Sequence, residues 1–397
     1  MSSEKSLTPQ IRFKGFTEAW EQCKFSDLTD EVIEKTITED EDILLSCAIT
    51  GIYTNSEYFS HFRGRSNIGY LKVKRNMLIL SAQNLHLGNA NVNLKFDHGI
   101  ISPAYKTFDL KNWNPVFANA WIKRPRANKF WDNATTAGAS LCRKNIVWKD
   151  LAEQIIYIPA IEKEQRQIGS IFELFDNLIT LHQRKLDALK KIKSALLEKM
   201  FPKDGSNIPE IRFTGFTEAW EQCKLGDLSK ILGGFAWSSK EYTPRGEYLV
   251  ITISNVTGDY FINDSIGNRI NLEKESNYVL ASGDILVSLT GNVGRVSKMG
   301  SSKGVLNQRV AKMIPSKKIE IEFLFQLMRD TKFELKMIES GQGAAQKNIS
   351  NNNILSYSTY IPNISEQKRI GHSFKKIDSL ITLHQRKLDA LKKIKSA

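Results

Sequence analysis

The sequence predicts an α+β fold, in which two mixed α/β domains are separated by two long helices packed as an antiparallel coiled coil, with a pseudo-twofold internal repeat. Three observations predict it. The stretch GFTEAWEQCK occurs at 15–24 and again, unchanged, at 215–224. The stretch LITLHQRKLDALKKIKSA occurs at 178–195 and again at 380–397. Around this second stretch, apolar residues recur in steps of four and three, the spacing of a helix seam.

The repeated blocks divide the chain into two copies of one order: an entry block, a variable insert and a long helix. The inserts, 25–157 and 225–360, look unrelated to each other. Two constant frames around two different inserts indicate one mechanical task performed on two different targets. We expect two insert domains that alternate with two helical segments, the four parts being 1–157, 158–204, 205–360 and 361–397.

Both inserts are expected to be mixed α/β with strand-rich cores. In the second, SGDILVSLTGNVGRVSKM (282–299) alternates apolar and polar residues and then turns at two glycines, which predicts a hairpin. In the first, RNMLILSAQNLHLGNANV (75–92) is its expected counterpart. Asn, Gln and Arg side chains can pair with base edges in the DNA major groove. The candidate contacts at these turns and at two later ones are Gln83, Asn84, Ser288, Thr290, Asn292, Arg295, Lys298, Gln308, Arg309, Gln346, Lys347 and Asn348.

The charge balance also indicates a polyanionic partner. The formal net charge is +13 and the isoelectric point is near 9.4. Basic residues cluster at several places in the first insert, although each cluster alone is equally consistent with a solvated surface. The candidate phosphate contacts are Arg63, Arg65, Lys72, Lys74, Arg75, Lys123, Arg124, Arg126, Arg143 and Lys144.

Each helix is expected to follow a proline, Pro159 or Pro362, and the first ends at the linker FPKDGSNIP. About 36 residues give a rod of roughly 54 Å. We expect the central five seam positions of each copy, Phe175 to Leu189 and Ile377 to Leu391, to form the helix and partner interface. His182 and His384 fall on the seam and are expected to meet there without chemistry. The seams are Ile168, Phe172, Phe175, Ile179, His182, Leu186, Leu189, Ile192 and Leu196, and Ile370, Phe374, Ile377, Ile381, His384, Leu388, Leu391 and Ile394.

Several features argue against catalysis, metal binding or membrane insertion. There is no GxxxxGK[ST] phosphate loop, no convincing glycine-rich adenosylmethionine loop and no nuclease-type carboxylate cluster. SPAY at 102–105 is interpreted as a turn at a strand edge. The four cysteines show no CxxC spacing, so we expect reduced thiols and no metal site. No run of 18 apolar residues and no signal peptide occur, which favours the cytoplasm.

Taken together, the motifs resemble the specificity subunit of type I restriction-modification enzymes. The sequence GFTEAWEQCK is similar to that of staphylococcal members. The resemblance covers nearly the whole chain. The first insert departs from the pattern, because ATTAGASLCRKNI (134–146) matches GQGAAQKNI only loosely. The matching motifs are GFTEAWEQCKFSDL, GDILVSLTGNVG at 283–294, LNQRV at 306–310, GQGAAQKNIS at 341–350 and IPNISEQKRI at 361–370.

The resemblance implies a non-catalytic subunit that selects a DNA sequence. Each insert would be a target recognition domain that reads one half of a bipartite, asymmetric site in double-stranded DNA. The helices would set the spacer and dock two methyltransferase subunits. Adenosylmethionine, ATP and magnesium would be bound by the methyltransferase and restriction subunits, and none by this chain.

Two alternatives remain open at this stage. A helical scaffold or regulator without sequence readout would also use long helices and repeats. A self-sufficient DNA-modifying enzyme would need a cofactor loop that the sequence does not show. The second helix copy stops at Ala397, where the first continues with LLEKMF, so we expect the natural protein to extend a few residues further.

Overall fold

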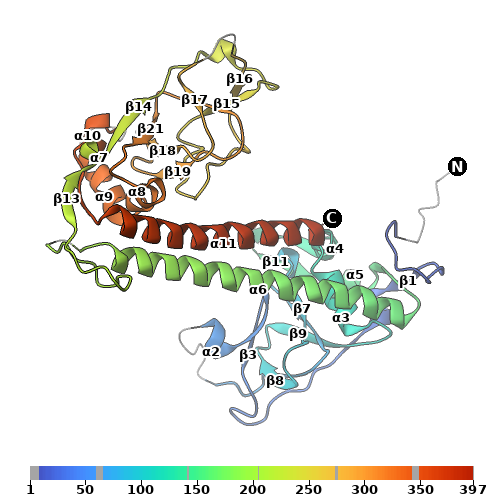
Figure 1. Cartoon of the computed structure of the whole chain (residues 1–397). Coiled ribbons are helices and arrows are strands. Elements are labelled where there is room, and N and C mark those ends of the chain that lie inside the picture. Colours follow the sequence, from blue (N-terminus) through green and yellow to red (C-terminus); the bar gives the residue numbers. More distant parts are fainter. Residues whose placement is uncertain are drawn as a thin grey trace. The chain divides into compact units, whose positions relative to one another are not determined.

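A computed structural model describes residues 9–59, 66–140, 143–203, 205–272, 276–341 and 348–396. It divides into two compact units, Met1–Leu181 with Asp389–Ala397 (unit 1) and His182–Leu388 (unit 2). Two long helices, α6 (Glu162–Met200, 39 residues) and α11 (Ile364–Ser396, 33 residues), each contribute to both units (Figure 1). Their lengths correspond to about 58 and 50 Å of helix.

Unit 1 is built on a four-stranded antiparallel sheet whose central strand is buried on both faces. The sequence LILS of β6 is apolar apart from its last residue, and all four side chains are buried, which is typical of a strand covered on both sides. The strand order is β2 (Thr29–Glu31), β9 (Tyr105–Leu110), β6 (Leu78–Ser81) and β7 (Ala90–Val92).

A second group of strands in unit 1 consists of two antiparallel pairs joined by one parallel bridge between Leu44 and Ile100. The resulting order is β4 (Gly51–Thr54), β3 (Leu45–Ala48), β8 (His98–Ile101) and β5 (Leu71–Lys74). The remaining strands pair as β1 (Glu21–Lys24) with β12 (Ile155–Ile158) and β10 (Thr135–Ser140) with β11 (Arg143–Ile146).

Short helices complete unit 1 and supply an aromatic core. Trp121 packs edge-to-face on Trp113, Phe130 and Trp131, an arrangement that aromatic quadrupoles favour. The helices are α1 (Phe25–Leu28), α2 (Asn55–Tyr58), the 3₁₀ turn η1 (Leu85–Leu87), α3 (Pro115–Ile122), α4 (Ala127–Asp132) and α5 (Trp148–Ala152).

Unit 2 contains two four-stranded sheets. The first, antiparallel sheet has the order β14 (Ser229–Gly233), β21 (Val310–Pro315), β18 (Ile285–Ser288) and β19 (Val296–Lys298). In the second, β15 and β20 are parallel, and the order is β16 (Arg269–Ile270), β15 (Tyr248–Ile251), β20 (Gly304–Leu306) and β17 (Val279–Leu280). A separate pair joins β13 (Glu221–Lys224) to β22 (Ser358–Ile361).

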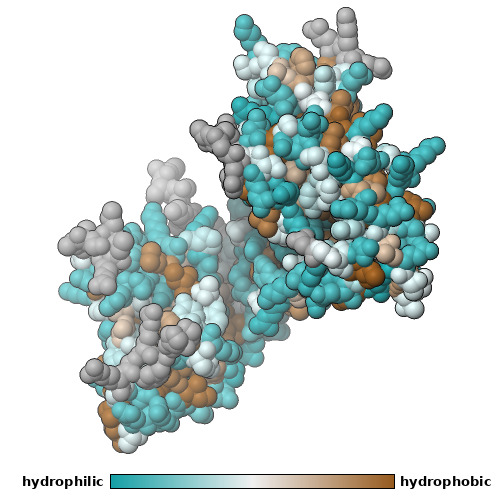
Figure 2. Space-filling model, turned by 90° about the vertical axis from the view of Figure 1, so that its left-hand side faces the viewer, coloured by the Kyte–Doolittle hydropathy of each residue, from teal (hydrophilic) through white to brown (hydrophobic). Residues whose placement is uncertain are grey.

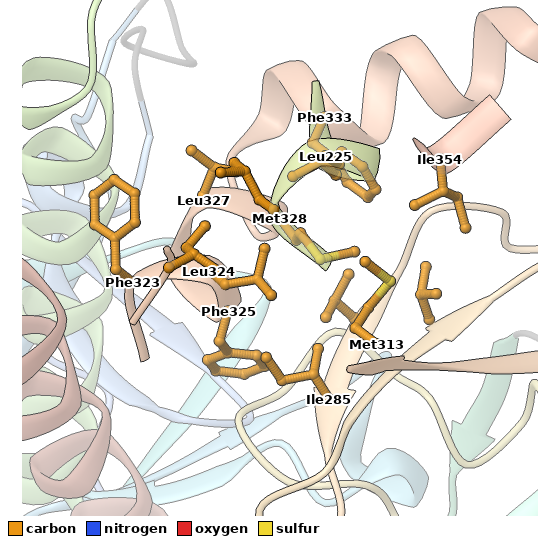
Figure 3. Close-up of a cluster of buried hydrophobic side chains, with 14 of the residues drawn as sticks. Leu225, Ile285, Met313, Phe323, Leu324, Phe325, Leu327, Met328, Phe333 and Ile354 are labelled. Carbon is orange, nitrogen blue, oxygen red and sulfur yellow. The ribbon is translucent and has the colours of Figure 1, made fainter. Parts of the chain in front are cut away.

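The core of unit 2 forms where α8 packs against the first sheet. Phe323, Leu324, Phe325, Leu327 and Met328, all from α8, are almost completely excluded from solvent and lie among side chains from the sheet and from α7, α9 and α10 (Figure 3). The helices are α7 (Leu225–Leu228), the 3₁₀ turn η2 (Ser239–Glu241), α8 (Ile321–Met328), α9 (Thr331–Ser340) and α10 (Asn351–Leu355).

The two inserts share one topology, although their sequences look unrelated. The sheet order β2-β9-β6-β7 corresponds to β14-β21-β18-β19, and β4-β3-β8-β5 corresponds to β16-β15-β20-β17. The hairpin expected at 75–92 therefore is the counterpart of that at 282–299, as β6–β7 and β18–β19. The predicted fold class, two mixed α/β domains with long helices and an internal repeat, is confirmed.

The repeated blocks hold the beginning and the end of each insert together. Arg12 donates two hydrogen bonds to Glu164 at 2.6 and 2.7 Å, and Arg212 donates two to Glu366, both at 2.7 Å. Both carboxylates are fully buried, and such bidentate pairs are geometrically specific. Together with the β1–β12 and β13–β22 pairs, they bind each entry block to the start of the helix that ends its own half.

Two repeated glycines let a helix of each insert approach the long helix. A Cβ atom on Gly169 would lie 2.5 Å from the Phe117 backbone nitrogen in α3, and one on Gly371 would lie 2.9 Å from that of Phe323 in α8. No other residue fits at this distance. The side chain of the buried Gln165 accepts from the backbone N–H of the α3 N-cap residue, and Gln367 does the same for α8.

The helix seam follows the expected spacing through its centre and differs near its ends. Leu186 and Leu388 are buried, and the ten expected interface positions are all buried or half-buried. Ile192 and Ile394, however, are 52% and 59% exposed, so placing them on the seam was wrong. Lys193 is buried in the seam instead, because its ammonium reaches the Asp378 carboxylate at 2.7 Å. Its repeat copy Lys395 pairs with Asp176.

The surface is largely polar. Figure 2 shows mostly hydrophilic residues on the visible face, with smaller apolar groups between them. Among the described residues, no helix combines the length and the apolar character needed to span a lipid bilayer.

Candidate nucleic-acid interface

Three loop segments of unit 2 meet at one edge of its first sheet. They follow β18 (289–295), precede β21 (307–309) and precede α10 (348–350). The Leu289 N–H donates to the Arg309 carbonyl, and the Ile349 N–H donates to the Leu289 carbonyl, both at 2.9 Å. Segments of the three motifs singled out in the second insert are therefore hydrogen-bonded to one another.

Most of the described candidates in unit 2 face solvent at this edge. Asn292, Gln308, Arg309 and Asn348 are exposed. Arg295 is 41% exposed and lies 3.7 Å from Glu334, a distance that leaves its guanidinium weakly held. The structure thus gathers amide and guanidinium groups, the side chains that read base edges.

Three further candidates in unit 2 support the loops from inside. Thr290 is 9% exposed, and its hydroxyl donates to the Asn348 side-chain carbonyl at 2.9 Å. Ser288 is fully buried and donates to the Asn292 backbone carbonyl. Lys298 is 4% exposed and pairs with the buried Glu322 at 2.5 Å. Ser288 and Lys298 are therefore corrected from DNA contacts to supports of the hairpin, because a buried, paired ammonium cannot reach a phosphate.

The equivalent edge of unit 1 is formed by the β6–β7 loop (82–89) and the β8–β9 loop (102–104). Gln83 and Asn84 are exposed on the first of these. The second contains the SPAY motif, which forms a turn between two strands as expected. Tyr105 at its end donates to the Cys47 carbonyl at 2.8 Å, and burial raises the pKa of this phenol to about 12.

The basic cluster at 72–75 is largely neutralised by neighbouring carboxylates. Lys72 lies 2.9 Å from Glu41, whose pKa is lowered to about 2 by a backbone hydrogen bond from Thr38 together with Lys72. Lys74 lies 3.5 Å from Glu34, and Arg75 lies 2.7 Å from Asp97. Paired in this way, the cluster carries little net positive potential. It is therefore a weaker candidate for contacts to DNA phosphates than its sequence suggested.

The remaining basic candidates differ in accessibility. Lys123 points inward, where its ammonium donates to the Ile49 carbonyl at 2.7 Å and to Asn91 at 2.6 Å. Burial lowers the pKa of Lys123 to about 8, so this residue too is corrected from a DNA contact to an internal one. Arg124 and Arg126 are exposed, with Arg124 over the Trp121 ring at 4.1 Å. Lys144 pairs with Asp132. Arg63, Arg65, Gln346, Lys347 and the side chain of Arg143 lie outside the described residues.

An aromatic group at the unit 2 edge was missed by the sequence reasoning. Phe235, Trp237 and Tyr278 lie beside the 307–309 loop, and Phe235 is 44% exposed. The available signal was the sequence GGFAW, in which a glycine pair at a strand end is followed by two aromatic residues.

The described residues contain no group of three or more His, Cys, Asp or Glu side chains placed to hold a metal ion. Cys23, Cys47 and Cys223 are free thiols.

The chain is similar to several known proteins. The family model for the type I restriction modification DNA specificity domain matches residues 134–191 and 217–393. The chain is 29% identical over 260 residues to the type I restriction enzyme MjaVIII specificity subunit of Methanocaldococcus jannaschii. The aligned region covers 62% of this chain and 61% of the MjaVIII subunit. The chain is 25% identical over 345 residues to the putative MjaX specificity subunit of the same organism, covering 85% and 75%.

A solved structure shares the fold. The S subunit of a type I restriction-modification system from M. genitalium superposes with a TM-score of 0.67 at 14% identity, covering 98% of this chain and 96% of that one. The chain spans about three fifths of the length of the MjaVIII subunit.

Proposed function

This chain belongs to the type I restriction-modification DNA specificity family, and we propose from this premise that it is the non-catalytic subunit that selects the DNA sequence. Each insert acts as a target recognition domain for one half of a bipartite, asymmetric site. Double-stranded DNA is its direct ligand, which places its work in the cytoplasm. Methylation and cleavage belong to partner subunits.

The observation that carries the proposal is the pair of equivalent loop edges. In unit 2, exposed Asn292, Gln308 and Arg309 belong to loops that are hydrogen-bonded together. In unit 1, Gln83 and Asn84 occupy the corresponding β6–β7 loop. The same scaffold carries different reading side chains, as two different half-sites require. Exposed basic residues such as Arg126 supply the phosphate contacts that position the domain.

The helices support docking of one kind of partner twice. Leu181 and its repeat copy Leu383 are both 45% exposed, and Ile192 and Ile394 are 52% and 59% exposed. Identical sequences thus leave the same apolar side chains uncovered, which favours a protein interface. We assign these positions to two methyltransferase subunits, which bind adenosylmethionine. Restriction subunits that use ATP and magnesium join them.

Reconstitution tests the proposal. We expect the purified chain alone to show no methyltransferase, nuclease or ATPase activity, and sequence-specific DNA methylation to appear when its methyltransferase partner is added. Selection from random duplexes should enrich two half-sites at a fixed spacing. A scaffold without readout would enrich nothing. Incorporation of methyl groups by the chain alone, after removal of any contaminating partner, would show a self-sufficient enzyme instead.

A further inference from the structure

Three aromatic rings in unit 2 form a partly open cluster beside the loop edge formed by 289–295, 307–309 and 348–350, which we call the reading edge. The Phe235 ring centroid lies 5.0 Å from that of Trp237 and 5.5 Å from that of Tyr278, and the Trp237 and Tyr278 rings are nearly perpendicular at 6.2 Å. Trp237 and Tyr278 pack against neighbouring core clusters, whereas Phe235 is 44% exposed and belongs to none. The cluster therefore leaves one large aromatic side chain uncovered.

The exposed ring is held rigidly beside the candidate base readers. The Phe235 N–H donates to the Leu306 carbonyl at 3.1 Å, and the Gln308 N–H donates to the Phe235 carbonyl at 3.0 Å. The Trp237 indole also donates to the Leu306 carbonyl, at 3.0 Å. A Cβ atom on Gly234 would lie 2.1 Å from the Asn307 carbonyl oxygen, so only glycine permits this close passage. Any DNA held by Gln308 and Arg309 is consequently next to Phe235.

The rings form walls of a cavity of about 640 Å³. Lys240, Thr243 and Asn271 add polar groups to its lining. Glu241 also lines it, but its carboxylate accepts from the Ser238 backbone N–H at 2.8 Å and so caps a turn. Aromatic rings line one part of the cavity and polar side chains line much of the rest, and the volume falls in the range of small-molecule pockets.

Unit 1 has a cavity that is lined in part by an equivalent residue. Its volume is about 780 Å³, and it is lined by Tyr58, Phe59, Tyr70 and the candidate reader Asn84. Tyr70 directly precedes β5, and Tyr278 directly precedes β17, which is the equivalent strand. An aromatic cavity beside the reading loops is therefore a feature of both inserts.

We propose that the Phe235, Trp237 and Tyr278 cavity binds a nucleobase that has left the stack of the DNA duplex, within the half-site read by unit 2. Phe235 stacks on the base, and the polar lining contacts its edge. This inference rests on the proposed DNA-recognition function. Base–aromatic stacking offsets part of the cost of unpairing, and the same stacking is possible for every base because each has a π-face.

Unpairing one base at a time tests the cavity. The full chain with its methyltransferase partner is titrated with duplexes in which the base opposite each position of the second half-site is replaced by an abasic site. Because an unpaired base costs less to extrude, we expect one position at which affinity rises on the order of tenfold or more. Phe235→Ala should abolish this gain and weaken binding to the paired site by roughly 5- to 150-fold.

Matched variants separate stacking from folding. Phe235→Tyr should retain the gain, whereas Phe235→Leu keeps an apolar side chain and should lose it. Phe261→Ala removes a ring that is 37% exposed in the same unit but does not line this cavity, and it should change nothing. Thermal unfolding of each variant checks that the unit remains folded.

The outcomes distinguish the cavity from the wider function. A gain that persists in Phe235→Ala, or no gain at any position, overturns the proposed base site while the half-sites are still selected. A gain confined to the methylated base and unaffected by Phe235→Ala belongs to the methyltransferase and likewise overturns it. Failure of the wild-type complex to enrich any sequence would contradict the proposed function itself.

Discussion

The candidate residues near the reading edge divide into exposed ones, which remain candidates for DNA contact, and buried ones, which support the loops. Arg309 is exposed at the edge, whereas Lys298 is buried on β19 with Glu322 at 2.5 Å. The sequence places both in short motifs with similar polar neighbours. Only the fold shows that one faces solvent and that the other neutralises an internal carboxylate, because Glu322 comes from a different element, α8.

Replacing Arg309 tests the contact class. If its guanidinium pairs with a guanine, Arg309→Ala should cost about 1–3 kcal/mol of binding free energy and relax sequence preference at one position of the second half-site only. Selection from random duplexes measures this, with the first half-site as an internal control. A uniform loss over all sequences, with a shallower dependence on salt, would identify a phosphate contact instead.

Replacing Lys298 tests the support class. Lys298→Ala leaves the buried Glu322 carboxylate without its charge partner, while the Tyr260 hydroxyl still donates to it, which should lower the free energy of unfolding by up to about 3–5 kcal/mol. The double variant Lys298→Met, Glu322→Gln removes both charges and should recover much of the loss. Denaturant unfolding measures both. An unchanged stability in the single variant, with a loss of DNA affinity, would return Lys298 to the contacts.

Elements were predictable from the sequence where the pattern is local. The hairpins at β6–β7 and β18–β19 and the long helices follow from periodicity and turn residues. The predicted seam did not include Lys193. A lysine is stable in an apolar seam only when a carboxylate pairs with it, and its partner Asp378 lies far away in the sequence. The common topology of the inserts was also hidden, since pairing between distant strands leaves no short-range signal.

The histidine pair makes the helix pairing in unit 2 sensitive to pH. The Nδ1 atoms of His182 and His384 lie 2.9 Å apart, so one ring donates and the other accepts. Burial is the main cause that lowers the pKa of His384, and the nearby positive charges of His182, Lys185 and Lys387 lower it further. Its unfolded pKa is about 6.5. The unfolded chain thus takes up the proton first, and stability that is full above about pH 6.5 decreases as the pH falls through 6.5 towards the lowered pKa.

Urea unfolding at pH 7.5 and pH 5.5 checks this prediction. We expect the wild-type chain to lose more stability between these values than His384→Gln, which can hydrogen-bond to His182 without titrating. Other ionisable groups contribute equally to both chains, so the difference isolates the pair. An identical loss in the two proteins would contradict a lowered His384 pKa.

At the scale of the whole molecule, α6 and α11 each extend through both units, so their length is available as a spacer. Inserting one heptad after His182 in α6 and one after His384 in α11 preserves the Lys193–Asp378 pair and the Lys395–Asp176 pair within their units. Each insertion adds about 10 Å of helix, which is about three base-pair steps of 3.4 Å.

The preferred spacer between half-sites should therefore lengthen by about three base pairs, and the half-site sequences should stay the same. Selection from random duplexes with variable spacers measures both properties in one experiment. A single insertion in α6 alone serves as the control, since it shifts Lys193 away from Asp378 and should weaken folding. An active double-insertion variant that keeps the original spacer would show that the helices are not the ruler.

The closure of each insert at its base has a consequence for inheritance. The polypeptide enters and leaves an insert beside one buried Arg–Glu pair, which is made by repeated sequence, and one short strand pair, of which only the first strand, β1 or β13, is repeated. A foreign insert has to match these junctions and also the close contact of its α3 or α8 with the long helix in order to fold on the same frame. Recombination between the identical flanking segments supplies such junctions without loss of register. Under the proposed function, we expect an exchanged insert to change the selected DNA sequence while the repeated helices stay the same.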